Sequence, residues 1–288
     1  KKLTPHAGNS LRIGVTGVPG VGKSTFIDTL GLILTKRGKK VAVLAVDPSS
    51  IVTKGSILGD KTRMDSLAND PLAFVRPSPT SGTLGGVAKK SRETMLVCEA
   101  AGYDVIFVET VGVGQSEVTV RSMVDFFMLL MIAGAGDELQ GIKRGVMELA
   151  DTLLINKADG DNVERAEVTC SEYNRALHYL LPATHGWRTE AYTCSAKEGT
   201  GVAEAWEVVE DFQKSTKESG VFYERRKSQI LEWFHNMIMD HLRTDFFSHG
   251  AVKKELPSLE KAIVEGDIPL IAAVDRLVSI FRKQEFEN

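Results

Sequence analysis

The sequence predicts an α/β fold: a mostly parallel sheet flanked by helices, followed by a helical C-terminal extension. Two observations support this prediction. Over most of the chain, apolar segments of strand length alternate with amphipathic segments of helix length, as in parallel sheets that are covered on both faces. Beyond residue 219 the alternation stops and only helical periodicity remains.

The expected strands are short apolar runs at the following positions: residues 11–16, 41–46, 105–108, 126–132, 152–155 and 191–194. The expected helices lie between them, at residues 23–37, 86–101, 139–150, 163–181 and 202–217. Ligands on such sheets bind at the carboxyl ends of the strands. The loops that follow the strands are therefore where functional residues are expected.

The C-terminal extension carries two apolar stripes with three- and four-residue spacing. The first stripe consists of Ile230, Leu231, Phe234, Ile238 and Leu242, and the second of Ile271, Val274, Leu277, Val278 and Phe281. We expect two amphipathic helices separated by Pro257 and Pro269, which pack on the core or on a second subunit. The predicted organisation is a remnant of an N-terminal segment at residues 1–10, an α/β domain at 11–218 and a helical arm at 219–288.

Composition restricts the class of partner. Hydrophobic residues (43%) and charged residues (25%) are in proportions typical of a globular protein, and the net charge is -3 without a long basic run. This argues against nucleic-acid binding and a polybasic membrane anchor. The most apolar segment, residues 126–135, is shorter than the about 20 residues that span a bilayer, so no membrane partner is expected.

The cysteines and the N-terminus bear on localisation. Cys98, Cys170 and Cys194 are odd in number and far apart, which indicates packing residues in a reducing, cytoplasmic compartment. No signal peptide opens the sequence. Lys1 is not a natural start, and we expect that an upstream segment, which could include a targeting sequence, has been removed.

A glycine-rich motif predicts a phosphate-binding site between the first strand and the first helix. The motif is G-x-x-x-x-G-K-[ST], a P-loop, and its context of strand and then helix is the one it requires. Its backbone N–H groups would converge on phosphates, Lys23 would supply a full charge, and the Ser24 hydroxyl would coordinate Mg²⁺. The nucleotide-contacting residues predicted here are Gly17, Val18, Pro19, Gly20, Val21, Gly22, Lys23, Ser24 and Thr25.

Two further loops predict that the base is guanine. An N-K-x-D motif follows the strand at residues 152–155, and its Asp159 can accept hydrogen bonds from guanine N1 and N2, a donor pair that adenine lacks. The loop at residues 195–197 ends the next strand, and the N–H of Ala196 could donate to guanine O6. The predicted base-contacting residues are Asn156, Lys157, Asp159, Ser195, Ala196 and Lys197.

Acidic residues at strand ends predict the magnesium and switch regions. Glu109 ends a strand where P-loop proteins place a carboxylate near Mg²⁺, and Gly112 lies where the γ-phosphate is contacted. No glutamine directly follows Gly112, since Gln115 is three positions on, so slow intrinsic GTP hydrolysis accelerated by a partner or by dimerisation is expected. The candidate metal ligands are Ser24, Asp47, Asp60 and Glu109, and the candidate catalytic residues are Lys23, Asp47, Asp60, Glu109 and Gly112.

Four segments resemble one family. They are VDPSS at residues 46–50, LGDKTRM at 58–64, ETVGVGQSE at 109–117 and GDELQGIK at 136–143. They are similar to the MeaB/MMAA/ArgK group of metallochaperone-type P-loop GTPases, chaperones of adenosylcobalamin-dependent methylmalonyl-CoA mutase. The resemblance runs from about Leu11 to Lys283.

The resemblance has functional implications. It implies a homodimer formed through the helical extension, binding to an acyl-CoA mutase, and GTP hydrolysis that gates cobalamin loading and helps protect the mutase. It also implies that residues 134–143 form the switch that senses the mutase. Family members usually carry a helical segment before the first strand, which is absent from this sequence.

Other functional classes are alternatives to this one. Related GTPases insert nickel, but the six histidines are scattered and are interpreted as surface or packing residues. An older family label, a transport-linked kinase, receives no support because the sequence has no membrane segment. Small-molecule kinases in general are disfavoured by the guanine-reading motif. A structural dimer that uses GTP as a clamp would bind the nucleotide without turnover.

Overall fold

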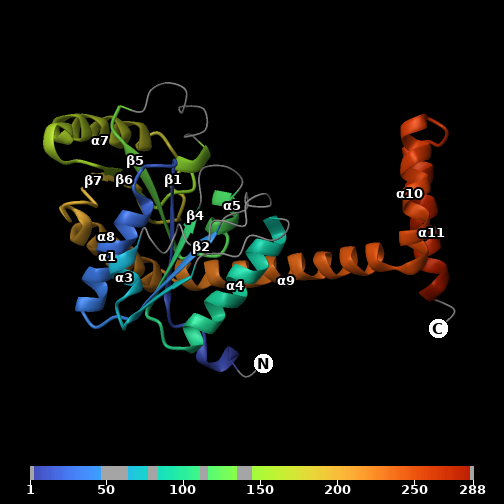
Figure 1. Ribbon diagram of the computed structural model, residues 1–288. Coiled ribbons are helices and arrows are strands. Elements are labelled where there is room, and N and C mark those ends of the chain that lie inside the picture. Colours follow the sequence, from blue (N-terminus) through green and yellow to red (C-terminus); the bar gives the residue numbers. More distant parts are fainter. Residues whose placement is uncertain (1–2, 47–63, 77–83, 111–115, 135–144, 286–288) are drawn as a thin grey trace. The chain divides into compact units, whose positions relative to one another are not determined.

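The computed structural model describes residues 3–46, 64–76, 84–110, 116–134 and 145–285 (Figure 1). Its internal contacts divide the chain into two units, Lys1–Arg226 and Lys227–Asn288. The first unit is an α/β domain and the second is helical. None of the described helices is both long enough and apolar enough to cross a membrane.

The first unit is built on one parallel sheet in the order β3-β2-β4-β1-β5-β6-β7. The strands are β1 Leu11–Gly17, β2 Val41–Val46, β3 Ala73–Arg76, β4 Val105–Thr110, β5 Phe126–Ile132, β6 Thr152–Asn156 and β7 Glu190–Thr193. The central strand β1 pairs with β4 on one side and β5 on the other, with Ile13 opposite Phe107 and Phe126. The carboxyl ends of all strands therefore lie along one edge of the sheet.

Helices cover both faces of the sheet (Figure 1). On one face, α1 Lys23–Lys36, α3 Asp65–Ala68 and α8 Val202–Glu218 pack into a core that includes Phe26, Leu67 and Trp206. On the other face, α4 Leu84–Ala100, α5 Ser116–Arg121 and α7 Val163–Leu177 pack into a second core that includes Met95 and Val120. Because both faces are covered, strands such as β2 and β4 are buried along their whole length.

A long helix, α9 Val221–Ser248, begins in the first unit. Arg226 near its start pairs with Asp125, with 2.7 Å between Nη2 and Oδ2, and the same guanidinium donates to the carbonyl of Ser10 at 2.6 Å. Burial alone would lower the pKa of Arg226, but the hydrogen bond and charge of Asp125 raise it above the usual value. The start of α9 is thus fixed to the amino ends of β1 and β5 by a buried ion pair.

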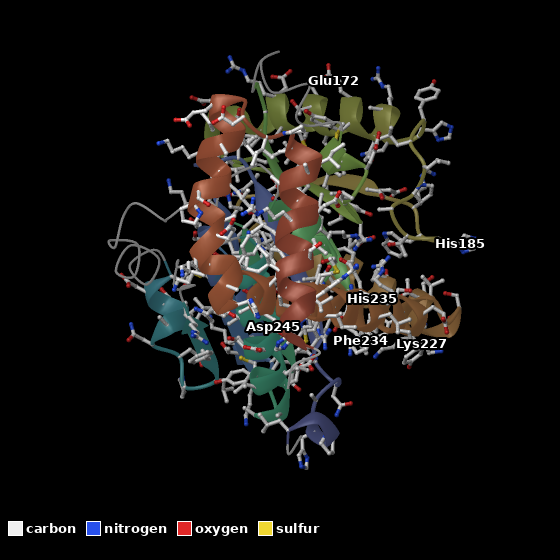
Figure 2. The ribbon with its side chains drawn as sticks, turned by 90° about the vertical axis from the view of Figure 1, so that its right-hand side faces the viewer. Glu172, His185, Lys227, Phe234, His235 and Asp245 are labelled. Carbon is white, nitrogen blue, oxygen red and sulfur yellow. The ribbon has the colours of Figure 1, made fainter. Side chains whose placement is uncertain are left out.

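The second unit contains the rest of α9 with α10 Gly250–Glu265 and α11 Leu270–Glu285. Helices α10 and α11 pack as an antiparallel pair, and Val252, Leu259 and Ala273 are buried. The apolar stripe of α9 is different, because its side chains Ile230, Leu231, Phe234, Ile238 and Leu242 are all exposed. Phe234 and its neighbour His235 are labelled on α9 in Figure 2.

The predicted fold class is confirmed, and all six predicted strands are present with ends shifted by at most two residues. Strand β3 was not predicted. The prediction that Pro257 separates two helices is wrong, because Pro257 lies inside α10, and the described part of the extension contains three helices. An internal proline costs about 3 kcal/mol, and the burial of Val252 and Leu259 on either side of it offsets this cost.

Two other predictions concern helix ends and cysteines. Helix α7 ends at Leu177, earlier than predicted, and most of the predicted helix at residues 139–150 lies outside the described residues. Cys98 and Cys194 are buried in the two cores, as expected for packing residues. Burial raises the pKa of Cys98 to about 11 and that of Cys194 to about 12.

Candidate nucleotide-binding site

The glycine motif forms a turn between β1 and α1, as its sequence predicts. Gly17, Gly20 and Gly22 all have positive φ, a conformation that residues with a Cβ rarely adopt. A Cβ on Gly17 would lie 2.4 Å from the carbonyl oxygen of Leu130 on β5, so only glycine fits where the loop leaves the sheet. The turn places backbone N–H groups and the start of α1 at one point, which is an anion-binding arrangement.

Lys23 brings a positive charge into this turn. It is the first residue of α1, and only 8% of its surface is exposed. Its ammonium donates to the carbonyl oxygens of Gly17 at 2.6 Å and Val18 at 3.3 Å. The contacts hold the charge against the loop, so that phosphate oxygens bound by the loop would meet it.

Ser24 and Glu109 come together next to the turn. The Ser24 hydroxyl donates to Glu109 Oε1 at 2.9 Å, and Glu109 is buried near the end of β4. Beside them, Thr110 donates to Thr16 at 2.8 Å and joins the ends of β4 and β1. A hydroxyl and a carboxylate in contact are oxygen donors of the kind that Mg²⁺ prefers, so this pair fits the predicted metal site.

Asn156 connects the two loops predicted to contact the base, residues 156–159 and 195–197, to the glycine turn. It ends β6 and is almost fully buried. Its Nδ2 donates to the carbonyl oxygen of Val21 at 2.8 Å, and its Oδ1 accepts from the N–H of Ala196 at 2.9 Å. The side chain therefore joins two loops that are far apart in sequence. The N–H of Ala196, predicted to donate to guanine O6, is used within the protein in this structure.

Asp159 is held in place by the second base-reading loop. Ser195 Oγ donates to Asp159 Oδ2 at 2.6 Å. Ser195 Oγ in turn accepts a hydrogen bond from the N–H of Glu198 at 3.1 Å. This fixes the carboxylate predicted to accept from guanine N1 and N2. It also gives Ser195 a defined role, which is to orient Asp159.

Lys157 has an unusual backbone conformation. Its φ is 63°, and no other non-glycine among the described residues has positive φ. Asn162 supports this conformation by donating to the Lys157 carbonyl oxygen at 2.7 Å. Strained backbone of this kind is found at functional sites, where the surrounding structure holds it. Here it turns the chain between Asn156 and Asp159, so that both side chains lie at the same sheet edge.

The structure brings together the described part of the predicted site: the glycine turn, Glu109 and both base-reading loops lie at the carboxyl ends of β1, β4, β6 and β7. Several predicted residues lie outside the described residues. These are Asp47, Asp60 and Gly112, together with residues 135–143 of the segment that the resemblance implies is a switch. Sequence reasoning missed the bonds from Asn156 to Val21 and from Thr29 to Ala196, because no local pattern marks contacts between distant loops.

Comparison with known proteins decides the family. The family model described as "Methylmalonyl Co-A mutase-associated GTPase MeaB" matches residues 1–251. The chain belongs to the MeaB family. This confirms the family indicated by the sequence segments, and the MeaB chain is accordingly a GTP-hydrolysing enzyme.

Relatives of this chain include one named as a GTPase and one named for methylmalonic aciduria. "Probable GTPase Rv1496" of Mycobacterium tuberculosis is 49% identical over 97% of this chain and 83% of its own length. "Methylmalonic aciduria type A homolog, mitochondrial" of Mus musculus is 44% identical over 96% of this chain and 66% of its own length.

Two solved structures resemble the chain. The one described as LAO/AO transport system kinase is 37% identical with a TM-score of 0.74, and the match covers 98% of this chain and 84% of that one. The structure of HypB from Helicobacter pylori in complex with nickel is 17% identical with a TM-score of 0.51, covering 74% and 89% of the two chains. At that identity the second likeness shows the fold alone.

Proposed function

We propose that this MeaB-family GTPase acts as a chaperone for adenosylcobalamin-dependent methylmalonyl-CoA mutase. It would couple GTP hydrolysis to the loading of the cofactor and to protection of the mutase. The observation that carries the proposal is the match to a family described as mutase-associated over residues 1–251. A relative named for methylmalonic aciduria supports the same client.

The proposed nucleotide site uses the residues already described. The glycine turn and Lys23 bind the phosphates, while Asn156, Lys157, Asp159 and residues 195–197 select guanine. The contact between Ser24 and Glu109 supports Mg²⁺ binding, with the Ser24 hydroxyl as a ligand and Glu109 acting directly or through a water. Asp47, Asp60 and Gly112 stay proposed on sequence alone.

We also propose a homodimer that forms through the helical arm. The exposed stripe on α9 supports it, since Ile230 is 61% exposed and Phe234 57% exposed in the chain by itself. Large apolar patches of this kind mark protein interfaces. The occupant we assign is a second copy of the arm, and the proposed compartment is the cytoplasm.

The experiment that tests the proposed function measures GTP hydrolysis by the purified protein with and without methylmalonyl-CoA mutase from the same source. We expect slow turnover alone and at least about tenfold stimulation by the mutase, as partners of GTPases commonly act by completing the catalytic site. Lys23→Ala should abolish both rates. Turnover that is indifferent to the mutase would contradict the chaperone function and leave the GTPase activity in place.

A second function is suggested by the solved structure described as a transport system kinase. A kinase would transfer phosphate to a small-molecule acceptor, whereas a GTPase needs only water. Phosphate release measured without any acceptor separates the two. Turnover that depends on an added acceptor would favour the kinase.

A further inference from the structure

Thr29 was not predicted as a site residue, but it contacts one of the loops predicted to bind the base. It lies on α1, five residues beyond the P-loop serine, and is half-buried. Its Oγ1 donates to the carbonyl oxygen of Ala196 at 2.7 Å. The phosphate-binding helix is thereby bonded directly to the loop that contacts the base.

This bond sets the direction of one peptide plane. In a trans peptide the carbonyl and the N–H of the next residue point in opposite directions, and the described residues contain no cis peptide bond. Since the Ala196 carbonyl points at Thr29, the N–H of Lys197 must point away from α1. Within the described part of the chain, that N–H has no hydrogen-bond acceptor.

The neighbouring amide is already used. The N–H of Ala196 donates to Asn156 Oδ1 at 2.9 Å, and Asn156 is in turn bonded to Val21. Releasing it toward a base would break a buried hydrogen bond, which costs about 1–3 kcal/mol. The Lys197 N–H is the donor in this loop that can meet an acceptor without such a loss.

We propose that Thr29 is a positioning residue for guanine recognition: through the Ala196 carbonyl it directs the N–H of Lys197 at guanine O6. Adenine carries an amino group in the place of O6, so a fixed N–H there opposes adenine as well as binding guanine. The inference rests on the proposed guanine-nucleotide site and adds to it a residue outside the sequence motifs.

The other bonds of the loop do not replace Thr29. The N–H of Ser195 donates to the Thr200 carbonyl at 2.9 Å, and the N–H of Gly199 donates to the Ser195 carbonyl at 2.8 Å. These bonds hold the two ends of the loop. Asn156 holds the preceding peptide plane, between Ser195 and Ala196, whereas Thr29 holds the plane between Ala196 and Lys197. Removing the Thr29 hydroxyl therefore frees this plane while the loop stays attached.

The test is the affinity of the purified protein for three diphosphates: GDP, inosine diphosphate, which keeps O6 but lacks the 2-amino group, and 6-thio-GDP, in which the weaker acceptor sulfur replaces O6. Thr29→Val removes the hydroxyl and keeps the shape of the side chain. We expect it to lose about five- to tenfold in affinity for GDP and inosine diphosphate, and at most about twofold for 6-thio-GDP. Thr29→Ser, which keeps the hydroxyl, should restore the wild-type pattern.

Thr35→Val is the matched control, because Thr35 lies on the same helix and donates to Asp70 at 2.7 Å, away from the base loops. It should leave all three affinities unchanged. Equal losses for all three nucleotides in Thr29→Val, or no loss, would overturn the role assigned to Thr29. A wild-type protein that binds ADP as tightly as GDP would contradict the guanine-nucleotide function itself, and the inference with it.

Discussion

At the residue scale, Asn156 depends on a glycine for its position. Its side chain passes Gly22, and a Cβ on Gly22 would lie 2.5 Å from Asn156 Nδ2. Asn156 cannot move away freely, because both ends of its amide are bonded, to Val21 and to Ala196. A glycine is thus required at position 22 for two reasons. The backbone there has a φ of 99°, and a side chain would occupy the space that Asn156 needs to join the loops predicted to contact the base.

This dependence predicts the effect of Gly22→Ala. The added methyl group should displace Asn156 and force an alanine into the left-handed region, at about 1–2 kcal/mol for the backbone alone. We expect GDP affinity to fall by more than about tenfold, measured by fluorescence titration. Gly38→Ala is the matched control, because Gly38 has a φ of 77° and open space around it. The control should lose stability and keep GDP affinity, and equal GDP affinity in both variants would contradict the role of Gly22.

The sequence indicated which residues form the candidate site, but not the bonds between them. The P-loop and N-K-x-D motifs indicated Lys23 and Asp159 because each motif lies within a short continuous segment, where the spacing of its residues can be recognised in the sequence. The contacts of Thr29 with Ala196 and of Asn156 with Val21 join segments separated by more than about a hundred residues, so they depend on how the sheet brings strand ends together. Sequence periodicity carries no information about such contacts.

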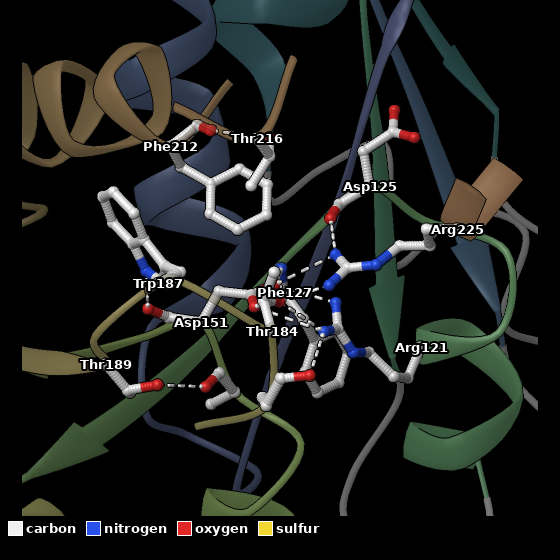
Figure 3. Close-up of polar contacts among 12 residues, drawn as sticks. Arg121, Asp125, Phe127, Asp151, Thr184, Trp187, Thr189, Phe212, Thr216 and Arg225 are labelled. Atoms are coloured by element: carbon white, nitrogen blue, oxygen red, sulfur yellow. Dashed lines mark hydrogen bonds and ion pairs between the residues drawn. The ribbon is translucent and has the colours of Figure 1, made fainter. Parts of the chain in front are cut away.

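At the element scale, Asp151 holds three elements together at the amino end of β6 (Figure 3). Its carboxylate pairs with Arg121 at the end of α5, at 2.8 Å and 3.2 Å, and accepts from the N–H of Phe127 on β5 at 2.9 Å. Arg225 on α9 lies 3.8 Å from the same carboxylate, and both arginines contact Thr184. Burial lowers the pKa of Arg225, and Arg121 lowers it further, while Asp151 opposes this shift.

Asp151→Asn should therefore destabilise the α/β domain strongly. The substitution would leave two buried guanidinium groups close together without their shared counter-charge, and breaking a buried ion pair costs about 3–5 kcal/mol. Chemical denaturation would measure the loss. The matched control is Glu265→Gln, which removes an exposed partner of Lys261 and should cost less than about 0.5 kcal/mol. A cost for Asp151→Asn below about 1 kcal/mol would mean that the cluster is not a significant source of stability.

The elements that the sequence failed to predict share a physical cause. Strand β3 has only four residues, with alternating half-buried and exposed side chains at the edge of the sheet, so it lacks the apolar run of the central strands. The interior position of Pro257 in α10 contradicts local propensity and depends on packing against α11. In both cases tertiary contacts decide the structure, whereas the buried central strands were recognisable from composition alone.

At the scale of the whole molecule, the helical arm explains why the chain would associate with a second copy. Helix α9 has apolar side chains at helical spacing, and these side chains are exposed in the single chain. A helix that is amphipathic along its length needs a partner for its apolar face. The exposed stripe therefore supports the proposed homodimer, which the resemblance of the sequence also implies.

The proposed dimer predicts the outcome of a double substitution, Phe234→Asp with Ile238→Asp. The two side chains are four residues apart on one face of α9. Each buried apolar side chain contributes about 1.5–3 kcal/mol, so two charges in their place should weaken the dimer by at least about 100-fold. Light scattering coupled to size-exclusion chromatography should then give the mass of one chain, with GDP binding retained.

The control for this experiment is Leu181→Asp, since Leu181 is 89% exposed in the α/β unit and lies outside the stripe. It should leave the oligomeric state unchanged. If the wild-type protein is a monomer at micromolar concentration, or if the double variant keeps the dimer mass, the arm does not mediate self-association. The stripe on α9 would then have to bind another protein, and stimulation of GTP hydrolysis by the mutase, lost in the double variant and kept in Leu181→Asp, would identify that protein.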